Sequence, residues 1–383
     1  MNYQKSERRR RNAAAGFTIV ELMISMVAFV FVIAAASQML TGLLTQFKQQ
    51  SKISETNIEG IIGLEILRHD LEHAGYGLPW VISGTIYSEA TSATPCGTAN
   101  PSTYNDSTSN PPRAMVSGNN NCINNSDYLV IKALNIAGND PSRKSTRLIS
   151  TSPYVRTWTP SSENLNLDTT DRVIVIKGGT GASLRELIES GGSFYTTYSN
   201  VTNAPWQPSE TSDVRIVYGI NDSSAPAPRM PFNRADYYIS TTEVLFPVPV
   251  RCAVGTGVLF KGTLNHGAGA LDPMPILDCA ADMQVVYRLD TNTDGTIDNE
   301  TDDISVLTAK QVRDQIKEVK VYILAHEGQR DPNYTYPNNP LQYVDGAFGT
   351  VINFDFAAAG ITNWQNYRWK VYTISVHTEN LGS

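Results

Sequence analysis

The chain has 383 residues, of which 41% are hydrophobic and 17% charged, and its formal net charge at pH 7 is −7. This acidic balance argues against a nucleic-acid-binding surface, which requires clustered basic residues. Once the N-terminal segment is set aside, roughly 300 residues remain, which is enough for one large β-rich domain or a domain with a substantial insertion.

The N-terminal segment combines a basic cluster with a long apolar run. Lys5 and the four arginines at 8–11, set against one acid, give residues 1–16 a net charge of 5 − 1 = +4. Residues 17–40 supply the roughly 20 apolar residues that a membrane-spanning helix needs. Within this run stands one acid, Glu21. Placing an ionised carboxylate in lipid costs free energy, so we expect Glu21 to have a functional role.

Three kinds of N-terminal segment compete for this pattern. A secretory signal peptide has an apolar region of roughly 7 to 15 residues followed by small residues at the cleavage site, whereas here the small residues 13–16 precede a longer run. A plain signal anchor explains the length and the basic flank, which stays in the cytoplasm, but it does not explain Glu21. A prepilin explains all of these features, since G-F-T-I-V-E at 16–21 resembles the type III signal of type IV pilins and type II secretion pseudopilins.

This resemblance implies a defined maturation. A prepilin peptidase would cleave between Gly16 and Phe17 and methylate the new α-amine. The assembly acid of the family corresponds to Glu21, about one helical turn from that amine. Because each charge is costly alone in lipid, the carboxylate would pair with the amine of a neighbouring subunit. The mature chain of 383 − 16 = 367 residues would carry a net charge of −7 − 4 = −11.

Helical periodicity continues to about residue 74. One stripe, which we expect to cover a β-sheet, consists of Ile53, Ile61, Leu64, Leu67 and Leu71. A second stripe, which faces either a loop of the same chain or another subunit, consists of Ile58, Ile62 and Ile66. Glycines at 42, 60 and 63 interrupt or soften the helix, and the breaker cluster at 75–79 ends it.

The remainder of the chain predicts strands joined by loops. Residues 88–126 are rich in Ser, Thr, Asn, Gly and Pro and predict a long surface loop. A short helix is expected at 183–190, with Ser183 as its cap. Alternating or compact apolar runs predict strands at 128–134, 172–177, 214–220, 237–239, 243–250, 283–289, 318–325 and 368–377.

One helix followed by many strands is an α+β arrangement, and with the N-terminal resemblance it implies a pilin-like fold. Its long helix has a membrane half and a sheet-packing half, and a large antiparallel β domain with a loop-rich insertion follows. The expected segments are a cleaved basic leader at 1–16, a transmembrane or filament-core helix at 17–44, its amphipathic continuation at 45–78, and a β-rich domain in the periplasm or outside the cell at 79–383.

The four cysteines favour two disulfides, because their number is even and the domain is expected to be translocated. Sequence proximity pairs Cys96 with Cys122 and Cys252 with Cys279, and each bond closes a loop of about 27 residues. The entropic model credits such loops with roughly 3 to 4 kcal/mol. Free or zinc-bound thiols are the alternative, but the chain contains no C-x-x-C pair.

The segment D-T-N-T-D-G-T-I-D at 290–298 matches the start of an EF-hand-like calcium loop, with Gly295 at the sharp turn. Its ligands would be Asp290, Asn292, Asp294, the carbonyl of Thr296, and Asp298. Thr301 replaces the glutamate of position twelve, so Asp302 or Asp303 would take over that role. The predicted cofactor is a structural Ca²⁺ ion, and the alternative is a turn of Asp, Asn and Gly residues without metal.

Two weaker patterns do not support catalysis. His69 and His73 lie one turn apart, but Asp70 stands where the H-E-x-x-H zinc motif requires Glu, so an exposed polar helix face is expected. The glycine-rich stretch 177–183 lacks the G-K-[ST] ending of a P-loop and predicts a tight turn. The sequence has no G-x-S-x-G nucleophile signature, and we expect no enzymatic activity.

Further motifs resemble PilW-type minor pilins. Residues 70–77, D-L-E-H-A-G-Y-G, are similar to the D-L-R-x-A-G-Y-G stretch that closes their N-terminal helix. Residues 286–290 and 316–324 and the ending at 367–381 resemble the latter part of that family, although Glu379 stands where Arg is usual. The resemblance implies a subunit that joins other minor pilins in a priming complex, starts polymerisation of the major pilin and can reach the pilus tip.

Other functions are compatible with the sequence. The J-type pseudopilin of a type II secretion system shares the topology and calcium binding. Residues 80–280 match no family and would form the binding face of a pilus-borne adhesin or ligand-binding subunit. A membrane-anchored periplasmic hydrolase would rest on His69 and His73 alone.

The prepilin interpretation also implies partners and a location. The expected partners are the prepilin peptidase, other minor pilins, the major pilin and the inner-membrane assembly machinery, without nucleic acid. The expected location is the bacterial inner membrane, crossed once, with the globular domain in the periplasm, and then the pilus at the cell surface.

Overall fold

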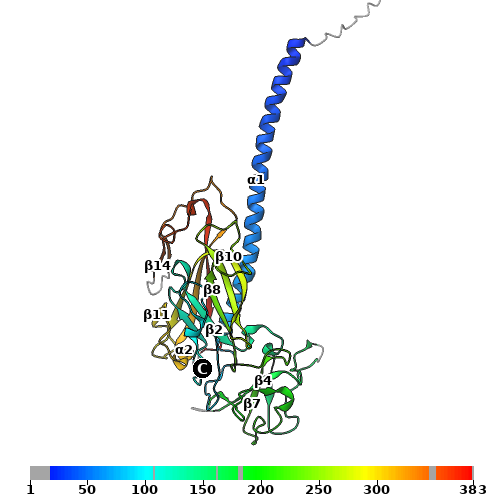
Figure 1. Cartoon of the computed structure of the whole chain (residues 1–383), viewed down its shortest axis with the longest axis vertical. Helices are drawn as coiled ribbons and strands as arrows, with labels where there is room; N and C mark the ends of the chain where they lie inside the picture. Colours follow the sequence, from blue (N-terminus) through cyan, green and yellow to red (C-terminus); the bar gives the residue numbers. More distant parts are fainter. Residues whose placement is uncertain (1–17, 107, 161–162, 180–183, 345–350, 382–383) are drawn as a thin grey trace, which may run out of the picture. The chain divides into compact units, whose positions relative to one another are not determined.

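The computed structural model describes residues 18–106, 108–160, 163–179, 184–344 and 351–381, and the chain divides into two units after Lys52. Helix α1 (Ile19–Glu72) contributes to both units (Figure 1). In the first unit every side chain that the structure describes is exposed, although the sequence there is largely apolar. A helix that is apolar all round requires lipid or other protein around it.

The second unit is built around an antiparallel sheet with the strand order β1-β2-β8-β9-β10-β12-β15, in which β11 pairs with β10 (Figure 1). Helix α2 (Ala309–Gln315) begins at a capping box formed by Thr308 and Gln311 and leads into β12. The strands of this sheet are β1 (Met115–Gly118), β2 (Tyr128–Ala133), β8 (Asn233–Ser240), β9 (Gly257–Leu264), β10 (Leu271–Leu289), β11 (Asn299–Thr301), β12 (Ile316–Glu327) and β15 (Arg368–His377).

A second, smaller sheet has the order β3-β7-β4-β5, with β6 paired to β4. One of its faces buries a cluster that includes Val173, Val217 and Trp206, and its other face, with Ile174 and Tyr218, belongs to the main hydrophobic core. Its strands, and those of a further hairpin, are β3 (Ser145–Leu148), β4 (Arg172–Lys177), β5 (Glu186–Leu187), β6 (Thr196–Thr197), β7 (Arg215–Asn221), β13 (Leu341–Val344) and β14 (Val351–Phe354). The architecture is the predicted one, a long N-terminal apolar helix followed by a large antiparallel β domain.

The end of α1 packs on one face of the main sheet, here called the inner face. Leu64, Leu67 and Leu71 are buried in the main hydrophobic core. A Cβ atom built on Gly63 would lie 1.8 Å from the carbonyl oxygen of Ile276 in β10, so only glycine allows this approach. The glycines predicted to interrupt or soften the helix leave it continuous, and Gly63 brings its backbone onto the strand.

The two predicted apolar stripes behave differently. The first is buried from Leu64 onward, but Ile61 is 57% exposed. In the second, Ile62 is 60% exposed and Ile66 is half-buried, while the side chain of Ile58 lies outside the described residues. No loop among the described residues therefore covers Ile62, and this face of α1 is exposed.

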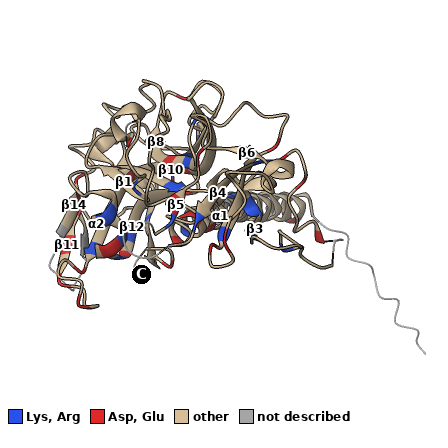
Figure 2. Cartoon of the chain, turned by 90° about the horizontal axis from the view of Figure 1, so that it is seen from below, with Lys and Arg blue, Asp and Glu red and all other residues tan. Residues whose placement is uncertain are grey.

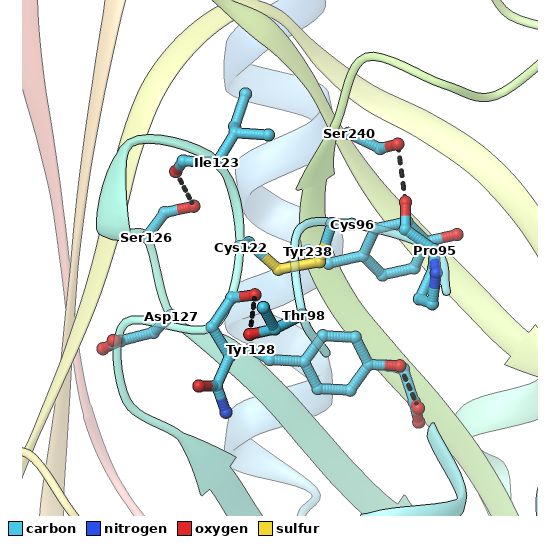
Figure 3. Close-up of a disulfide and its surroundings, with 12 residues drawn as sticks. Pro95, Cys96, Thr98, Cys122, Ile123, Ser126, Asp127, Tyr128, Tyr238 and Ser240 are labelled. Atoms are coloured by element: carbon cyan, nitrogen blue, oxygen red, sulfur yellow. Dashed lines mark hydrogen bonds between the residues drawn. A yellow bond between two sulfur atoms is a disulfide. The ribbon is translucent and has the colours of Figure 1, made fainter. Parts of the chain in front are cut away.

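The segment 88–126, predicted as a surface loop, instead covers the outer face of the main sheet. The Cys96–Cys122 disulfide lies beside Tyr238 of β8, and the Ser240 hydroxyl donates a hydrogen bond to the carbonyl of Pro95 at 2.6 Å (Figure 3). The second disulfide joins Cys252 to Cys279, so both bonds have the pairing that sequence proximity favours. The first disulfide, the hydrogen bond of Ser240 and the burial of Tyr104 against the sheet all hold the segment in place.

Beneath this segment lies a buried charge network. The Lys132 ammonium lies 2.7 Å from a carboxylate oxygen of Glu89 and also contacts Asp106. The Arg234 guanidinium lies 2.7 Å from Asp236 and 3.2 Å from Glu89. All five side chains are at most 4% exposed. Although burial opposes ionisation, the charge of Lys132 holds the pKa of Asp106 below its usual range.

Two predicted elements are wrong. Residues 243–250 were expected to form a strand, but they form a loop in which Val244 is 91% and Leu245 79% exposed. Pro247 and Pro249 have no N–H group to give to a strand ladder. The helix expected at 183–190 is replaced by the short strand β5, and Ser183 itself lies outside the described residues.

We predict that Gly63→Ala lowers the free energy of unfolding of the β domain by roughly 1 to 3 kcal/mol, because the added Cβ overpacks the contact with β10. Gly42→Ala is the matched control, since a Cβ at Gly42 meets nothing within 4 Å. Thermal unfolding of the two variants measures the difference. Equal melting temperatures for Gly63→Ala and wild type would contradict the close contact between α1 and β10.

Candidate functional site

The first described turn of α1 forms a capping box. The backbone N–H of Glu21 donates to the Thr18 hydroxyl oxygen at 3.2 Å, and the N–H of Thr18 donates to a Glu21 carboxylate oxygen at 3.3 Å. The Thr18 hydroxyl donates to the same carboxylate oxygen at 3.3 Å. The two residues thus satisfy N–H groups that the start of a helix leaves without partners. The predicted processing residues Gly16 and Phe17 lie outside the described residues.

This arrangement gives Glu21 a fixed position. Its carboxylate is held at the N-terminal end of α1, where the helix dipole favours negative charge. The next charged residue along the chain is Lys48, so Glu21 is alone among apolar side chains. The role of Thr18 was missed from the sequence, although the T-x-x-E spacing of a capping box is visible at 18–21.

The helix segment Ile19–Ser54 is long and apolar enough to cross a membrane by length and composition. Glu21 is the third residue of α1. The described contacts of the Glu21 carboxylate are with Thr18 in the cap of its own helix, and the neighbouring apolar side chains provide no cation. It can therefore accept a cationic partner supplied by another chain.

The acidic segment after β10 folds as a tight loop around Asp290. The buried Asp290 carboxylate accepts hydrogen bonds from the backbone N–H groups of Asp294 at 3.0 Å and Gly295 at 2.8 Å. Gly295 has φ +91°, a conformation that favours glycine. The Lys317 ammonium lies 3.8 Å from the same carboxylate. The predicted first and sixth positions of the calcium loop are thus in contact.

The next predicted ligands belong to the same loop. The side-chain oxygen of Asn292 accepts the N–H of Asp294 at 3.0 Å, and the Asp294 carboxylate accepts the N–H of Thr296 at 2.8 Å. Each of these oxygens keeps a lone pair after accepting one hydrogen bond. Asp290, Asn292, Asp294 and Thr296 therefore carry oxygen atoms of the kind that coordinate calcium in proteins.

The remaining predicted ligands lie elsewhere. The Asp298 carboxylate accepts the N–H and hydroxyl of Thr291 at 2.9 Å, and the hydrogen bond from the Thr291 backbone is the main reason that its pKa lies below the usual range. Asp302 follows β11, in which Thr301 pairs with Tyr287, whereas Asp290 follows Leu289. At the rise of a strand this places Asp302 on the order of 10 Å along the sheet from Asp290.

Among the described residues, three His, Cys, Asp or Glu side chains offer metal-ligating atoms within 4.8 Å of one another only at Cys252, Cys279 and His326. The two sulfur atoms there form a disulfide, so this group is a covalent crosslink beside an imidazole. No three carboxylates of the 290–298 loop have oxygen atoms that all lie within 4.8 Å of one another. Acidic and basic segments alternate around α2, β11 and β12 (Figure 2).

Two sequence patterns were weighed above as possible catalytic features, namely the pair of histidines on α1 and the glycine-rich stretch at 177–183. His69 and His73 stack with ring centroids 4.2 Å apart, and Nδ1 of His73 lies 2.9 Å from the His69 carbonyl. Both line a groove beside α1. Of the glycine-rich stretch, residues 180–183 lie outside the described residues.

A buried carboxylate also lies near the acidic segment. Asp127 accepts backbone N–H groups from Asn120 at 3.0 Å and Val285 at 2.8 Å. Burial raises the pKa of Asp127 to about 7, and the charges of Asp302 and Asp303 add to that effect. The native state therefore favours the protonated form of this group up to near-neutral pH.

We predict that Asp127 makes the fold less stable as pH rises. Its native pKa of about 7 is above the unfolded value of about 4, so its contribution to stability is complete below pH 4 and is lost as pH rises through 7. Relative to Asp127→Asn, wild type should lose stability over this range in denaturant titrations. Asp298→Asn, at an exposed carboxylate, should leave the slope unchanged above pH 5. Parallel pH profiles for wild type and Asp127→Asn would contradict the prediction.

Comparison with known proteins identifies one feature. Residues 11–37 match the family model described as the prokaryotic N-terminal methylation motif. The chain matches no curated protein and no solved structure. The matched segment includes the predicted cleavage position, the capping box and Glu21. The motif, which type IV pilins and pseudopilins carry, and the apolar helix support a prepilin-like protein that is anchored in the membrane by a single pass.

Proposed function

We propose that this chain is a minor pilin of the PilW type, which prepilin peptidase processes and which takes part in priming the assembly of a type IV pilus. The observation that carries the proposal is the lone Glu21 carboxylate, capped by Thr18 at the start of an apolar helix within the methylation motif. The subunit acts by inserting this helix beside those of other pilins, so no catalytic group is required.

The end of α1 also supports the PilW type. The D-L-E-H-A-G-Y-G stretch closes the helix, and its Gly75 has φ +83° where the chain turns into the β domain. Asp70, the first residue of the stretch, contacts the Tyr237 hydroxyl and the Lys261 ammonium. Through these contacts of Asp70 the stretch holds the end of α1 against the main sheet, which explains why particular residues are needed there.

The processing step follows from the same segment. Cleavage between Gly16 and Phe17 removes the basic leader, and methylation keeps the charge of the new amine. The amine of one subunit and the Glu21 carboxylate of its neighbour then form an ion pair in an apolar environment. Because removing one partner of such a pair leaves the other uncompensated, Glu21 controls incorporation.

We further propose that the loop at 290–298 binds a structural Ca²⁺ ion through Asp290, Asn292, Asp294 and the carbonyl of Thr296. The support is the spacing of oxygen ligands and the contact between Asp290 and Gly295. The bound ion would hold the loop rigid. Asp298 and Asp302 are the weaker candidates, because the first is bonded to Thr291 and the second follows β11.

Replacing Glu21 tests the function. In a strain that lacks the native gene, Glu21→Ala should reduce the number of surface pili by at least about a hundredfold relative to wild type, because leaving one member of a buried ion pair without its partner costs roughly 3 to 5 kcal/mol. The count is made by electron microscopy and by immunoblotting of sheared pili. Normal piliation with Glu21→Ala would contradict the proposed role.

Two controls accompany this test. Intact mass should show that wild type and Glu21→Ala both lack the first 16 residues and gain about 14 Da from methylation, so that a defect lies in assembly rather than in processing. Secretion of type II substrates should stay normal in the same strains. Loss of secretion with normal piliation would assign the chain to the J-type pseudopilins instead.

Calcium binding is tested by calorimetry and thermal unfolding. Wild type should bind Ca²⁺ with a dissociation constant of about 10⁻⁴ to 10⁻³ M and gain thermal stability that a chelator removes. Asp294→Asn, at an exposed ligand, should abolish both effects, whereas Asp302→Asn should leave them unchanged. Equal calcium responses of wild type and Asp294→Asn would show that the loop is a turn without metal.

A further inference from the structure

A two-stranded ribbon, here called the edge ribbon, lies at one side of the second sheet and spans residues 145–158. Its first strand is β3, which also pairs with β7. The backbone N–H of Arg156 donates to the Arg147 carbonyl at 3.0 Å, and Leu148 pairs with Val155 in an antiparallel bridge. This register places Arg147 directly opposite Arg156.

The two faces of the edge ribbon differ in composition. Leu148 lies on one face and is buried in the apolar cluster of the second sheet. Because side chains alternate along a strand, the other face carries Tyr154, Arg156 and Trp158 on one strand and Arg147 on the facing one. Both arginines are exposed, and Tyr154 is 38% exposed. The outward face of the edge ribbon thus combines two cations with aromatic rings.

The positive charges of the edge ribbon are not neutralised within the described chain. No carboxylate of the described residues lies within 4.0 Å of the guanidinium group of Arg147 or Arg156. The Cβ atoms of directly opposite residues lie about 4.5 to 5.5 Å apart, and like charges in such a pair are destabilising. An anion bound between the two guanidinium groups would replace this repulsion with charge-assisted hydrogen bonds.

Trp158 holds one of the two cations in place. The central carbon Cζ of the Arg156 guanidinium lies 4.0 Å from the centre of the Trp158 ring. The ring is itself fixed, because its Nε1–H donates to the Ser145 carbonyl at 2.9 Å. Stacking uses the flat face of a guanidinium and leaves the N–H donors in its plane free. Arg156 is therefore pre-organised for a planar anion that accepts two hydrogen bonds, such as a carboxylate.

The composition of the outward face restricts the ligand. A nucleic acid or a densely sulfated polymer has closely spaced charges and requires a row of cations, whereas this face offers two, in a chain of net charge −7. The two oxygens of one carboxylate are sufficient for both arginines. Tyr154 lies two residues from Arg156, roughly 7 Å along the strand, and offers a flat apolar surface to a sugar ring.

We propose that the edge ribbon binds an acidic polysaccharide of the uronate type, with a sugar ring on Tyr154 and its carboxylate between Arg147 and Arg156. The site lies outside the segment that matches the methylation motif. It gives the β domain a ligand-binding role that does not depend on Glu21, and the inference therefore stands apart from the proposed function.

Isothermal titration calorimetry of the full chain in detergent with hexagalacturonate tests the site. Wild type should bind one molecule per chain, and Arg147→Gln and Arg156→Gln should each weaken binding at least about tenfold, the effect of losing one charge-assisted hydrogen bond. The matched control is Arg143→Gln in the 3-10 helix η4 (Pro141–Arg143), an exposed arginine with the same change in charge, which should bind like wild type. Absence of binding by wild type, or equal affinities of the three variants, would overturn the proposal.

The choice of ligand and the integrity of the fold are checked on the same proteins. Hexaglutamate, a sulfated hexasaccharide and hexathymidylate should each bind wild type more weakly than hexagalacturonate does, and equal or tighter binding of any of them would refute the uronate. Arg147→Gln should melt at or above the wild-type temperature, because it removes a like-charge pair. A lower melting temperature would assign Arg147 a structural role instead. Purified protein requires no assembly, so failure of the Glu21→Ala test would leave these results unaffected.

Discussion

The contact between α1 and β10 is the interaction on which the β domain depends. Gly63 brings the helix backbone against the carbonyl of Ile276, and this approach lets Leu67 and Leu71 reach the core of the main sheet. The same contact determines which side of the helix remains free. With its leucines turned to the sheet, α1 leaves Ile61 and Ile62 beside the open groove, so the burial of one stripe causes the exposure of the other.

The parts of the fold that the sequence predicts are those governed by local pattern. The 3.6-residue period indicates the helix, and the boundaries of β4 and β15 agree with the predicted runs at 172–177 and 368–377. At the candidate site, the position of Glu21 followed from the motif. The pairing of the acidic loop, Asp290 with Gly295, is likewise local, because ligand and turn are five residues apart.

The other parts depend on contacts between distant residues, which local pattern does not contain. The apolar run at 243–250 has the composition of a strand, but its prolines deny it a ladder and it stays exposed. The polar segment 88–126 has the composition of a surface loop, yet Glu89 and Asp106 are buried because Lys132 lies opposite them in β2. The sequence pattern does not predict the groove either, because β9 was not predicted and because Met274 and Ile62, which both line it, are far apart in the sequence.

The charge network under the covering segment has an evolutionary consequence. Lys132, Glu89 and Asp106 come from separate parts of the sequence and are shielded from water, so a change at one position unbalances the buried charges that remain, including Arg234 beside Glu89 and Arg113 beside Asp106. We therefore expect substitutions there to be tolerated mainly in combination. Among relatives of this chain, the three positions should therefore vary together, either retaining opposite charges or becoming neutral as a set, while nearby surface positions drift independently.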